Sequence, residues 1–195
     1  MRDVDAVLLA GGRATRLGGI DKTALGAAGD TLLDRALRAT AGAARRIVVA
    51  GPPSAPAPAG VLWTTERPRH GGPAAALAAA LAVPGPAAPA VLLLAADLPH
   101  VEEAVPALLA QVDPAGAVDG WIAVDADGRD QPLLGLYRRE PLLAALTALP
   151  GGPAGAPLRR VLERLTLARV PVAAGLLADV DTPADARAAG LGLPR

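Results

Sequence analysis

The sequence predicts an α/β fold: a single domain with a Rossmann-like, mostly parallel sheet and helices on both of its faces. Short apolar runs alternate with longer amphipathic segments along the chain, which is typical of parallel strands connected by helices. At 195 residues the chain is long enough for one domain with a substantial core. No internal repeat or long linker interrupts this alternation, so we expect one domain over residues 1–195.

The strands are predicted from short runs of Val, Leu, Ile and Ala that end at Gly, Pro or Asp. The most apolar run, 89–97, is expected at the centre of the sheet. The segments "GWIAVD" and "QPLLGLY" are expected to be two strands joined by the turn "ADGRD". The predicted strands are 4–10, 46–51, 61–65, 89–97, 120–125, 131–137 and 168–173.

Helices are predicted where apolar residues recur on one helical face and capping residues precede them. Asp30 is the expected N-cap of the first helix, and Pro73, after Gly72, the first residue of the second. Pro106 is acceptable in the third only if that helix begins close before it. The predicted helices are 30–44, 71–82, 102–112, 140–149, 157–165 and 182–190.

The composition excludes several classes of function. There is no cysteine, which rules out disulfides and thiolate metal sites, and two histidines cannot make a zinc site by themselves. The formal net charge is zero, so no nucleic-acid or membrane partner is expected. The first residues do not resemble a signal or transit peptide, and the longest apolar stretch, 90–96, is too short to span a bilayer. We therefore expect a soluble, cytoplasmic protein; the sequence leaves its oligomeric state open and is compatible with a monomer.

Polar or glycine residues mark the points where four predicted strands end. These strand ends are Gly11-Gly12, Ala50-Gly51, Thr65-Glu66 and Asp97. In parallel α/β sheets, ligands bind at the carboxyl edge of the strands. The sequence therefore predicts a binding site to which these four strand ends contribute.

The first of these ends leads to Lys22, the only lysine in a chain whose other 18 basic residues are arginine. A Gly-Gly turn after a strand lets backbone N–H groups approach phosphate oxygens, and an ammonium can approach one oxygen as a point charge. A Walker A loop is excluded because Asp21 precedes Lys22, and no G-x-G-x-x-G fingerprint is present. A tight strand-to-helix turn and an exposed lysine remain the alternative interpretations.

Residues 9–22 read L-A-G-G-x-x-x-R-L-G-G-x-D-K, and this motif resembles the opening motif of the MobA-like nucleotidyltransferases. Four later segments resemble that family in the same order and cover essentially the whole chain. They are "GGPAAALAAAL" (71–81), "LLAADLP" (93–99), "QPLLGLYRR" (131–139) and "DVDTPAD" (179–185). The resemblance implies a fold like that of the nucleotide-diphospho-sugar transferases.

The resemblance implies transfer of GMP from GTP to molybdopterin-bound molybdenum, with release of pyrophosphate and with Mg²⁺ as the cofactor. Residues 1–110 would bind the nucleotide and the metal, and residues 111–195 would face the phosphorylated molybdopterin-type acceptor. Asp97 matches the metal-binding Asp of the family, although a turn residue or helix cap is the alternative interpretation. The implied catalytic residues are Lys22, Arg16 and Asp97, and the implied nucleotide-binding residues are Leu9, Ala10, Gly11, Gly12, Lys22, Glu66 and Asp97.

Other side chains have two interpretations each. Arg138, Arg139, Arg159 and Arg160 could bind the acceptor phosphate or lie in solvent. Asp179 and Asp181 could hold a second metal, but we expect them to cap the last helix. His70 could contact the ligand, but we expect an exposed loop imidazole.

Two positions depart from the family pattern. Ala50 stands where the family usually has Asn, and Arg67 where it has Asp beside the position of Glu66. Both positions concern recognition of the nucleotide rather than of its phosphates. The sequence therefore leaves two alternatives open: a related transferase that uses CTP, another NTP or another phosphorylated acceptor, and a non-catalytic nucleotide-binding homologue.

Overall fold

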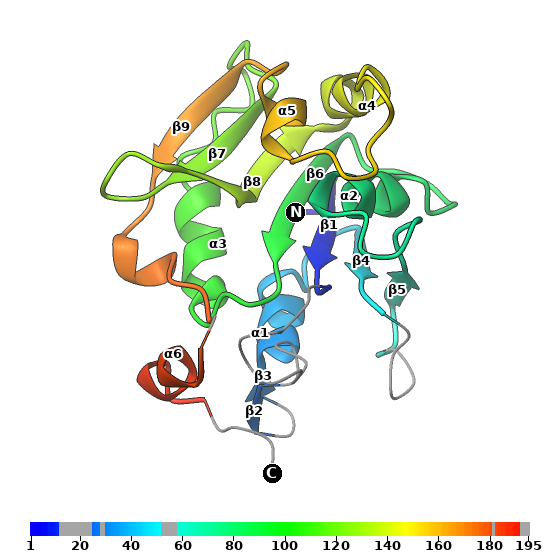
Figure 1. The fold of residues 1–195 in the computed structure, drawn as a ribbon. Coiled ribbons are helices and arrows are strands. Elements are labelled where there is room, and N and C mark those ends of the chain that lie inside the picture. The colour runs from blue at the N-terminus through cyan, green and yellow to red at the C-terminus, as the bar shows by residue number, and fades with distance from the viewer. Residues whose placement is uncertain (12–24, 28–29, 52–57, 181, 192–195) are drawn as a thin grey trace.

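The computed structural model describes residues 1–11, 25–27, 30–51, 58–180 and 182–191. Within these residues, seven strands form one sheet in the order β5-β4-β1-β6-β8-β7-β9 (Figure 1). A separate antiparallel pair consists of β2 (Gly26–Ala27) and β3 (Asp30–Thr31). The strands of the large sheet are β1 (Val4–Leu9), β4 (Arg45–Val49), β5 (Val61–Thr64), β6 (Ala90–Ala95), β7 (Gly120–Val124), β8 (Asp130–Arg138) and β9 (Leu167–Pro171).

The sheet is mostly parallel, as the sequence predicts, and β8 is the strand that runs against the others. β1 pairs in parallel with β4 and with β6, whereas β8 pairs antiparallel with both β6 and β7. The apolar run of β6 lies at the centre of the order, which confirms the position expected for it. Because β1 and β6 have helices on both sides, their side chains are buried without alternation.

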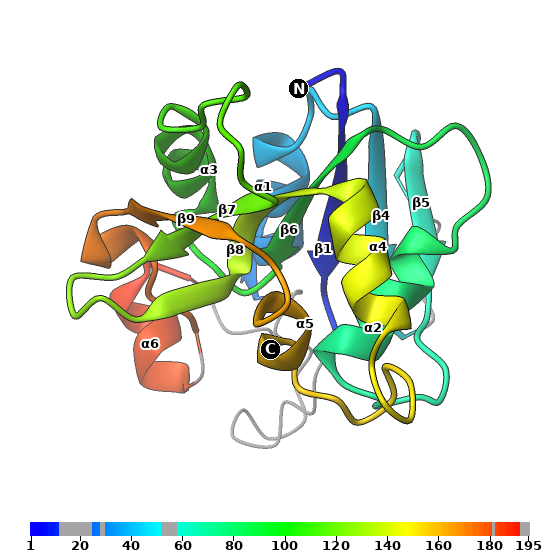
Figure 2. The ribbon, with the colours of Figure 1, turned by 90° about the horizontal axis from the view of Figure 1, so that it is seen from above.

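Helices cover both faces of the sheet (Figures 1 and 2). α1 and α3 pack in one apolar cluster, and α2, α4 and α5 pack in a second cluster on the other face. No helix in the described part of the chain is long and apolar enough to cross a membrane. The helices are α1 (Leu32–Ala39), α2 (Pro73–Leu81), α3 (Val101–Leu109), α4 (Arg139–Thr147), α5 (Arg159–Leu162) and α6 (Pro183–Ala188), with a 3₁₀ turn η3 (Ala174–Leu176).

The N-cap of α1 is Thr31, so the prediction of Asp30 as the cap was wrong. The Thr31 hydroxyl accepts the Asp34 N–H at 3.2 Å, and the Asp34 carboxylate accepts the Thr31 N–H at 2.9 Å. This reciprocal pair is a capping box. The Asp30 carboxylate instead pairs with Arg35 at 2.7 Å and with Arg38 at 2.6 Å, one and two turns into the helix.

Pro106 is the sixth residue of α3, so it lies in the second turn of the helix rather than in the first. A proline there removes the hydrogen bond that its N–H would donate to the carbonyl of Glu102. Both Glu102 and Pro106 are exposed, so this interruption lies on the solvent side of the helix. The buried side of α3, with Val101, Ala104 and Leu108, keeps its packing against the sheet.

Candidate functional site

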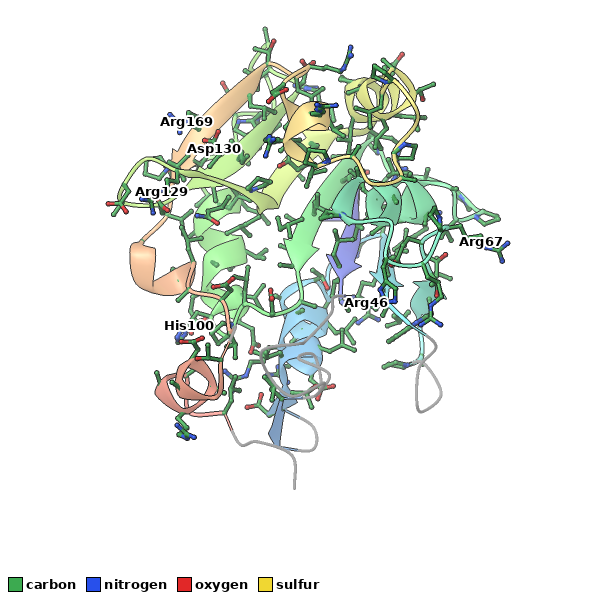
Figure 3. The ribbon with its side chains drawn as sticks, in the orientation of Figure 1. Arg46, Arg67, His100, Arg129, Asp130 and Arg169 are labelled. Carbon is green, nitrogen blue, oxygen red and sulfur yellow. The ribbon has the colours of Figure 1, made fainter. Side chains whose placement is uncertain are left out.

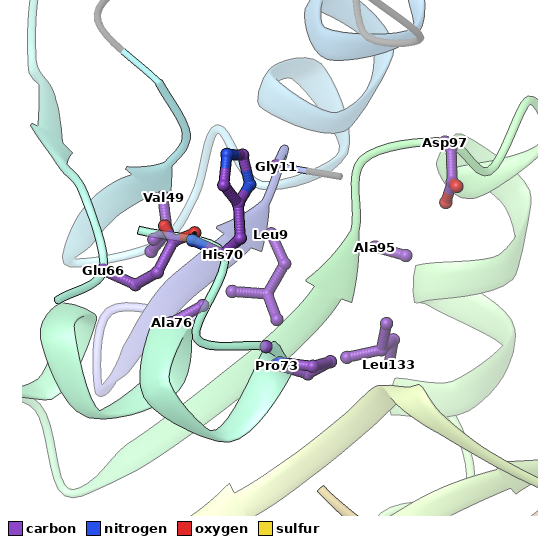
Figure 4. A pocket seen from close by; sticks show the side chains of 11 residues that line it. Leu9, Gly11, Val49, Glu66, His70, Pro73, Ala76, Ala95, Asp97 and Leu133 are labelled. Atoms are coloured by element: carbon purple, nitrogen blue, oxygen red, sulfur yellow. Dashed lines mark hydrogen bonds between the residues drawn. The ribbon is translucent and has the colours of Figure 1, made fainter. Parts of the chain in front are cut away.

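A pocket of about 540 Å³ lies at the carboxyl edge of the parallel strands. β1, β4 and β6 each end at this edge, and the loop after β5 and the start of α2 complete the wall (Figure 4). Three of the four predicted strand ends, at Gly11, Glu66 and Asp97, therefore contribute to one cavity. The lining residues are Leu9, Gly11, Val49, Glu66, His70, Gly72, Pro73, Ala76, Ala95, Asp97 and Leu133.

The last residues before Gly11 are hydrogen-bonded to the two neighbouring strands, β4 and β6. Ala10 donates its N–H to Val49 at 2.9 Å, and the Leu9 carbonyl accepts the Ala96 N–H at 3.1 Å. Leu9 lines the pocket, but Ala10 does not, because successive side chains of a strand point to opposite faces. Ala10 packs against the cluster under α1 and α3, and its N–H is engaged, so the predicted nucleotide contact of Ala10 cannot use that N–H.

Glu66 is half-buried and follows the end of β5. One of its carboxylate oxygens accepts the backbone N–H of His70 at 2.9 Å, which closes the loop between β5 and α2. Glu66 and Asp97 lie at opposite sides of the pocket (Figure 4). Two acidic side chains thus bracket the cavity at its two ends.

The loop reaches α2 through two glycines. Gly72 is the N-cap with φ 86°, and Pro73 is the first helical residue, as predicted. Gly71 is buried, and a Cβ at this position would lie 2.9 Å from the Pro68 carbonyl oxygen and from the Ala75 methyl. The close packing of this loop against α2 therefore requires glycine at position 71.

A second pocket of about 300 Å³ shares Ala95, Asp97 and Leu133 with the first. Gln131, Pro132 and Leu134 of β8, with Leu177 and Asp179, line its other walls. The Val180 N–H donates to the Asp97 carbonyl at 3.2 Å, which holds the segment before α6 against the end of β6.

Asp179 therefore lies in the same pocket as Asp97, and the prediction that it caps the last helix was wrong. The N-cap of α6 is Thr182, whose hydroxyl accepts the Asp185 N–H at 3.2 Å. Asp181 lies outside the described residues. Within those residues no group of three or more His, Asp or Glu side chains is arranged to hold a metal.

The wall that β8 gives to the second pocket is shaped by Tyr137. Its hydroxyl donates to the Pro132 carbonyl at 3.1 Å, and a Cβ on Gly135 would meet that hydroxyl at 2.5 Å. Burial raises the pKa of Tyr137, so the phenol stays protonated and acts as a donor. The glycine and tyrosine of "QPLLGLY" thus have a packing role, while Gln131 and Pro132 face the site.

Arg138 is at the opposite edge of the sheet and does not reach the site. Because β8 runs antiparallel to β6, Arg138 pairs with Ala90, the first residue of β6. Its guanidinium lies over the Trp121 ring, 5.7 Å from the ring centroid. It donates hydrogen bonds of 2.8 to 3.0 Å to three backbone carbonyls, those of Pro114, Gly116 and Val118.

Arg139 lies beside it in a buried ionic cluster. Asp5, which is fully buried, pairs with both Arg45 and Arg139. The interpretation of Arg138 and Arg139 as acceptor-binding residues was therefore wrong, because both guanidiniums are engaged at the amino edge. Arg159 and Arg160 are exposed on α5 and are not among the described residues that line the two pockets.

The two positions that depart from the family pattern offer no side-chain contact to the first pocket. Ala50 is buried, its N–H donates to the Thr64 carbonyl at 3.1 Å, and its carbonyl accepts the Thr65 hydroxyl at 2.7 Å. Arg67 is exposed and borders a shallow groove on the outer side of β5 and α2 (Figure 3).

The remaining predicted residues, Gly12, Arg16 and Lys22, lie outside the described residues. His70 is exposed in its loop, as expected, and it also lines the pocket, which agrees with the alternative of a ligand contact. Its signal in the sequence is its place between the end of a strand and the Gly-Gly-Pro start of a helix, within reach of the predicted ligand edge.

A sheet of this topology, with a pocket at the carboxyl edge lined by Gly11 and a carboxylate at the end of the central strand, is typical of nucleotide-binding α/β proteins. Residues 6–170 match the MobA-like NTP transferase domain. The chain belongs to this family, and its activity is that of a nucleotidyltransferase. No curated protein matches the chain.

Solved structures share the fold over nearly the whole chain. The homologue, from Mycobacterium sp. strain JC1, of Rv0371c of Mycobacterium tuberculosis is 24% identical with a TM-score of 0.73, and 97% of each chain is covered. Molybdopterin-guanine dinucleotide biosynthesis protein A from Archaeoglobus fulgidus is 18% identical (TM-score 0.58; 95% of this chain and 96% of that chain). The 2-C-methyl-D-erythritol 4-phosphate cytidylyltransferase of Thermus thermophilus is 21% identical (TM-score 0.62; 94% and 96%). The fold is that of the nucleotide-diphospho-sugar transferases, as predicted.

Proposed function

We propose that this nucleotidyltransferase is a molybdenum cofactor guanylyltransferase, which transfers GMP from GTP to the terminal phosphate of a molybdopterin that carries molybdenum. The observation that carries the proposal is the convergence of Gly11, Glu66 and Asp97 on one pocket. These residues come from three strand ends that the family motifs single out. The nucleotide would occupy this pocket, with its phosphates toward Gly11.

In the proposed reaction, an oxygen of the acceptor phosphate forms a bond to the α-phosphorus of GTP. The bond from that phosphorus to its bridging oxygen breaks, and pyrophosphate leaves with the electron pair. A phosphate monoester has a second pKa of about 6, so the attacking oxygen is already ionised near neutral pH. The reaction therefore needs no general base, and the barrier is the approach of two anions and the charge that grows on pyrophosphate.

The residues at the end of β6 suit a magnesium ion. Mg²⁺ is bound by one or two carboxylates together with phosphate oxygens and water. Asp97 and Asp179 present carboxylates around one pocket, and oxygen donors of this kind are what Mg²⁺ prefers. Asp97, with Asp179 in the lining of the same pocket, would hold the ion, which when bound neutralises phosphate charge. Lys22 and Arg16 would add positive charge from the segment after Gly11.

The two pockets suggest separate binding sites for the nucleotide and the acceptor. Residues 1–110 would bind the nucleotide and the metal, and residues 111–195 would complete the acceptor side. The acceptor would enter the second pocket, where Gln131 and Asp179 offer polar groups among Leu134 and Leu177. Acceptor binding would then depend on the first half of the "QPLLGLYRR" segment rather than on its arginines.

A panel of nucleotides tests the proposal. The full chain is incubated with Mg²⁺, a molybdopterin acceptor and GTP, CTP, ATP or UTP, and pyrophosphate release is measured. We expect GTP to be turned over well above the others, and Lys22→Ala to abolish release while the far-UV circular dichroism stays unchanged. Failure of GTP to release pyrophosphate with a competent acceptor would refute the proposal.

A transferase that uses CTP is the second candidate, and a specific observation favours it. Ala50 and Arg67 give the pocket no amide or carboxylate where the family places its nucleotide-recognising pair. One of the structural neighbours is a cytidylyltransferase. In the same panel, CTP turnover above GTP would establish this candidate, and tight GTP binding without pyrophosphate release would indicate a non-catalytic homologue.

A further inference from the structure

His70 adopts a backbone conformation that is unusual for its residue type. Its φ is 61°, in the left-handed region that glycine enters without a steric penalty and other residues seldom adopt. Its backbone N–H is held by the Glu66 carboxylate at 2.9 Å. Glycine would fit this position better, yet the chain places a side chain here immediately before Gly71 and Gly72. A strained residue at the wall of a pocket suggests that its side chain has a function.

The imidazole is the only aromatic ring among the described residues that line the first pocket. Within the described part of the chain no hydrogen bond or ion pair holds this ring; only the backbone N–H of His70 is engaged. The other aromatic side chains are committed elsewhere. Trp63 donates its indole N–H to the Gly51 carbonyl at 2.8 Å, while Trp121 and Tyr137 are buried.

The position of the ring within the pocket indicates which part of a nucleotide it would meet. His70 and Glu66 lie on the side of the pocket formed by β5 and the loop before α2, across from Asp97 (Figure 4). The floor between them is apolar, with Leu9, Pro73 and Ala76. An apolar floor and an exposed ring, distant from the metal-binding carboxylate, fit the planar base of a nucleotide rather than its phosphates.

We propose that the imidazole of His70 stacks on the nucleobase of the bound nucleoside triphosphate. This inference rests on the proposed function only in requiring that the first pocket binds such a nucleotide. Stacking on an aromatic side chain is tolerant of base identity because every base has a π-face. His70 thus provides affinity for the base in a pocket where Ala50 cannot hydrogen-bond to it, and it does not select between GTP and CTP.

The test is isothermal titration of the full-length chain with Mg²⁺ and three probes: GTP, CTP and inorganic tripolyphosphate, which has no base. His70→Gly removes the ring and suits a φ of 61°, so its melting temperature should equal or exceed that of the wild type. We expect it to bind both nucleotides about tenfold more weakly and tripolyphosphate with unchanged affinity. His70→Tyr, which restores a ring, should recover most of the lost affinity.

Arg67→Ala is the matched control, because it shortens an exposed side chain of the same loop that faces the outer groove. It should bind all three probes like the wild type. Equal GTP affinity in His70→Gly and the wild type would overturn stacking alone. An equal loss for tripolyphosphate would overturn it too, in favour of a phosphate contact or a role in loop structure. A wild-type chain that binds neither GTP nor CTP would overturn both the proposed function and the stacking.

Discussion

The substitution Asp5→Asn tests the interpretation of the amino edge of the sheet as structural. The Asp5 side chain is fully buried, and its partners Arg45 and Arg139 are only 11% and 15% exposed. Asp5 is also the acceptor for the Ala88 N–H at 3.3 Å. Burial lowers the pKa of Arg139, and the negative charge of Asp5 opposes that effect. Removing this charge leaves two buried guanidiniums side by side without a counter-ion.

The expected loss follows from the burial of these three groups. Removing one partner of a buried ion pair costs about 3–5 kcal/mol, because the remaining charge is left uncompensated. Both arginines retain a backbone acceptor, Val83 for Arg45 and Ala88 for Arg139, so we expect the lower end. A loss of about 3 kcal/mol in a domain of this size corresponds to a melting temperature lower by roughly 6–12 °C.

Urea denaturation followed by circular dichroism measures the free energy of unfolding. Asp3→Asn is the control, because Asp3 is exposed and should change stability by less than about 0.5 kcal/mol. Equal stability of the two variants would refute the reasoning. Arg139→Gln should likewise destabilise the fold, whereas an acceptor-binding arginine would lose acceptor affinity and leave the melting temperature unchanged.

Three further predictions concern the site and its surroundings. Gly71→Ala places a methyl 2.9 Å from two neighbouring heavy atoms, so it should cost about 1–3 kcal/mol and weaken nucleotide binding. Gly175→Ala, whose methyl would enter open space, should be neutral in the same thermal unfolding and titration assays, and equal melting temperatures for the two would contradict the packing argument. The hydrogen bond from Arg35 lowers the pKa of Asp30 below its ordinary value of 3.8, so this pair stabilises the fold above that pH and loses its effect as the pH falls through the lowered value. The difference in melting temperature between the wild type and Arg35→Gln should therefore shrink as the pH falls below 3.8, and a constant difference would count against the ion pair. Asp97→Asn should raise the Mg²⁺ concentration for half-maximal pyrophosphate release at least about tenfold, and an unchanged titration would remove Asp97 from the metal site.

The main elements of the fold could be predicted because each depends on local pattern. The apolar run 89–97 could be placed at the centre since strands buried on both faces lack alternation. Ligands bind at the carboxyl edge of parallel strands, and this alone predicted that Gly11, Glu66 and Asp97 line one cavity, with no knowledge of the loop conformations. Ala50 is the exception: it lies beneath that edge, where the Thr65 hydroxyl ties down its carbonyl.

The prediction put Arg138 and Arg139 of "QPLLGLYRR" at the binding site because it did not take into account that β8 runs antiparallel to β6. A short turn connects β7 to β8, and its backbone is fixed by Asp125, whose carboxylate accepts the N–H groups of Asp127 and Arg129. A turn this short joins neighbouring strands that run antiparallel. β8 therefore begins at the site and ends at the amino edge, which carries Arg138 away from the pocket. That inference was available from the sequence.

His70 and Asp179 could not be placed in the same way. The side chain of His70 faces the pocket because its φ is positive and its N–H is held by Glu66, and neither property leaves a periodic trace in the sequence. Asp179 lines the same pocket as Asp97 because the Val180 N–H donates to the Asp97 carbonyl, and these two segments are more than 80 residues apart. Both placements depend on long-range packing or loop geometry rather than on local preference.

Asp97 lies where the two substrates of the proposed transfer would meet. The reaction requires two anionic substrates to meet at one phosphorus atom, and the largest electrostatic barrier is at that point. Ala95, Asp97 and Leu133 are shared by the two pockets, so a nucleotide in one and an acceptor in the other would come together at the end of β6. A metal held there would lie between both substrates, whereas a metal at either far wall would serve only one. The end of the central strand is therefore a suitable place for this carboxylate. The backbone of β6 is fixed there by a strand on each side and by helices on both faces of the sheet.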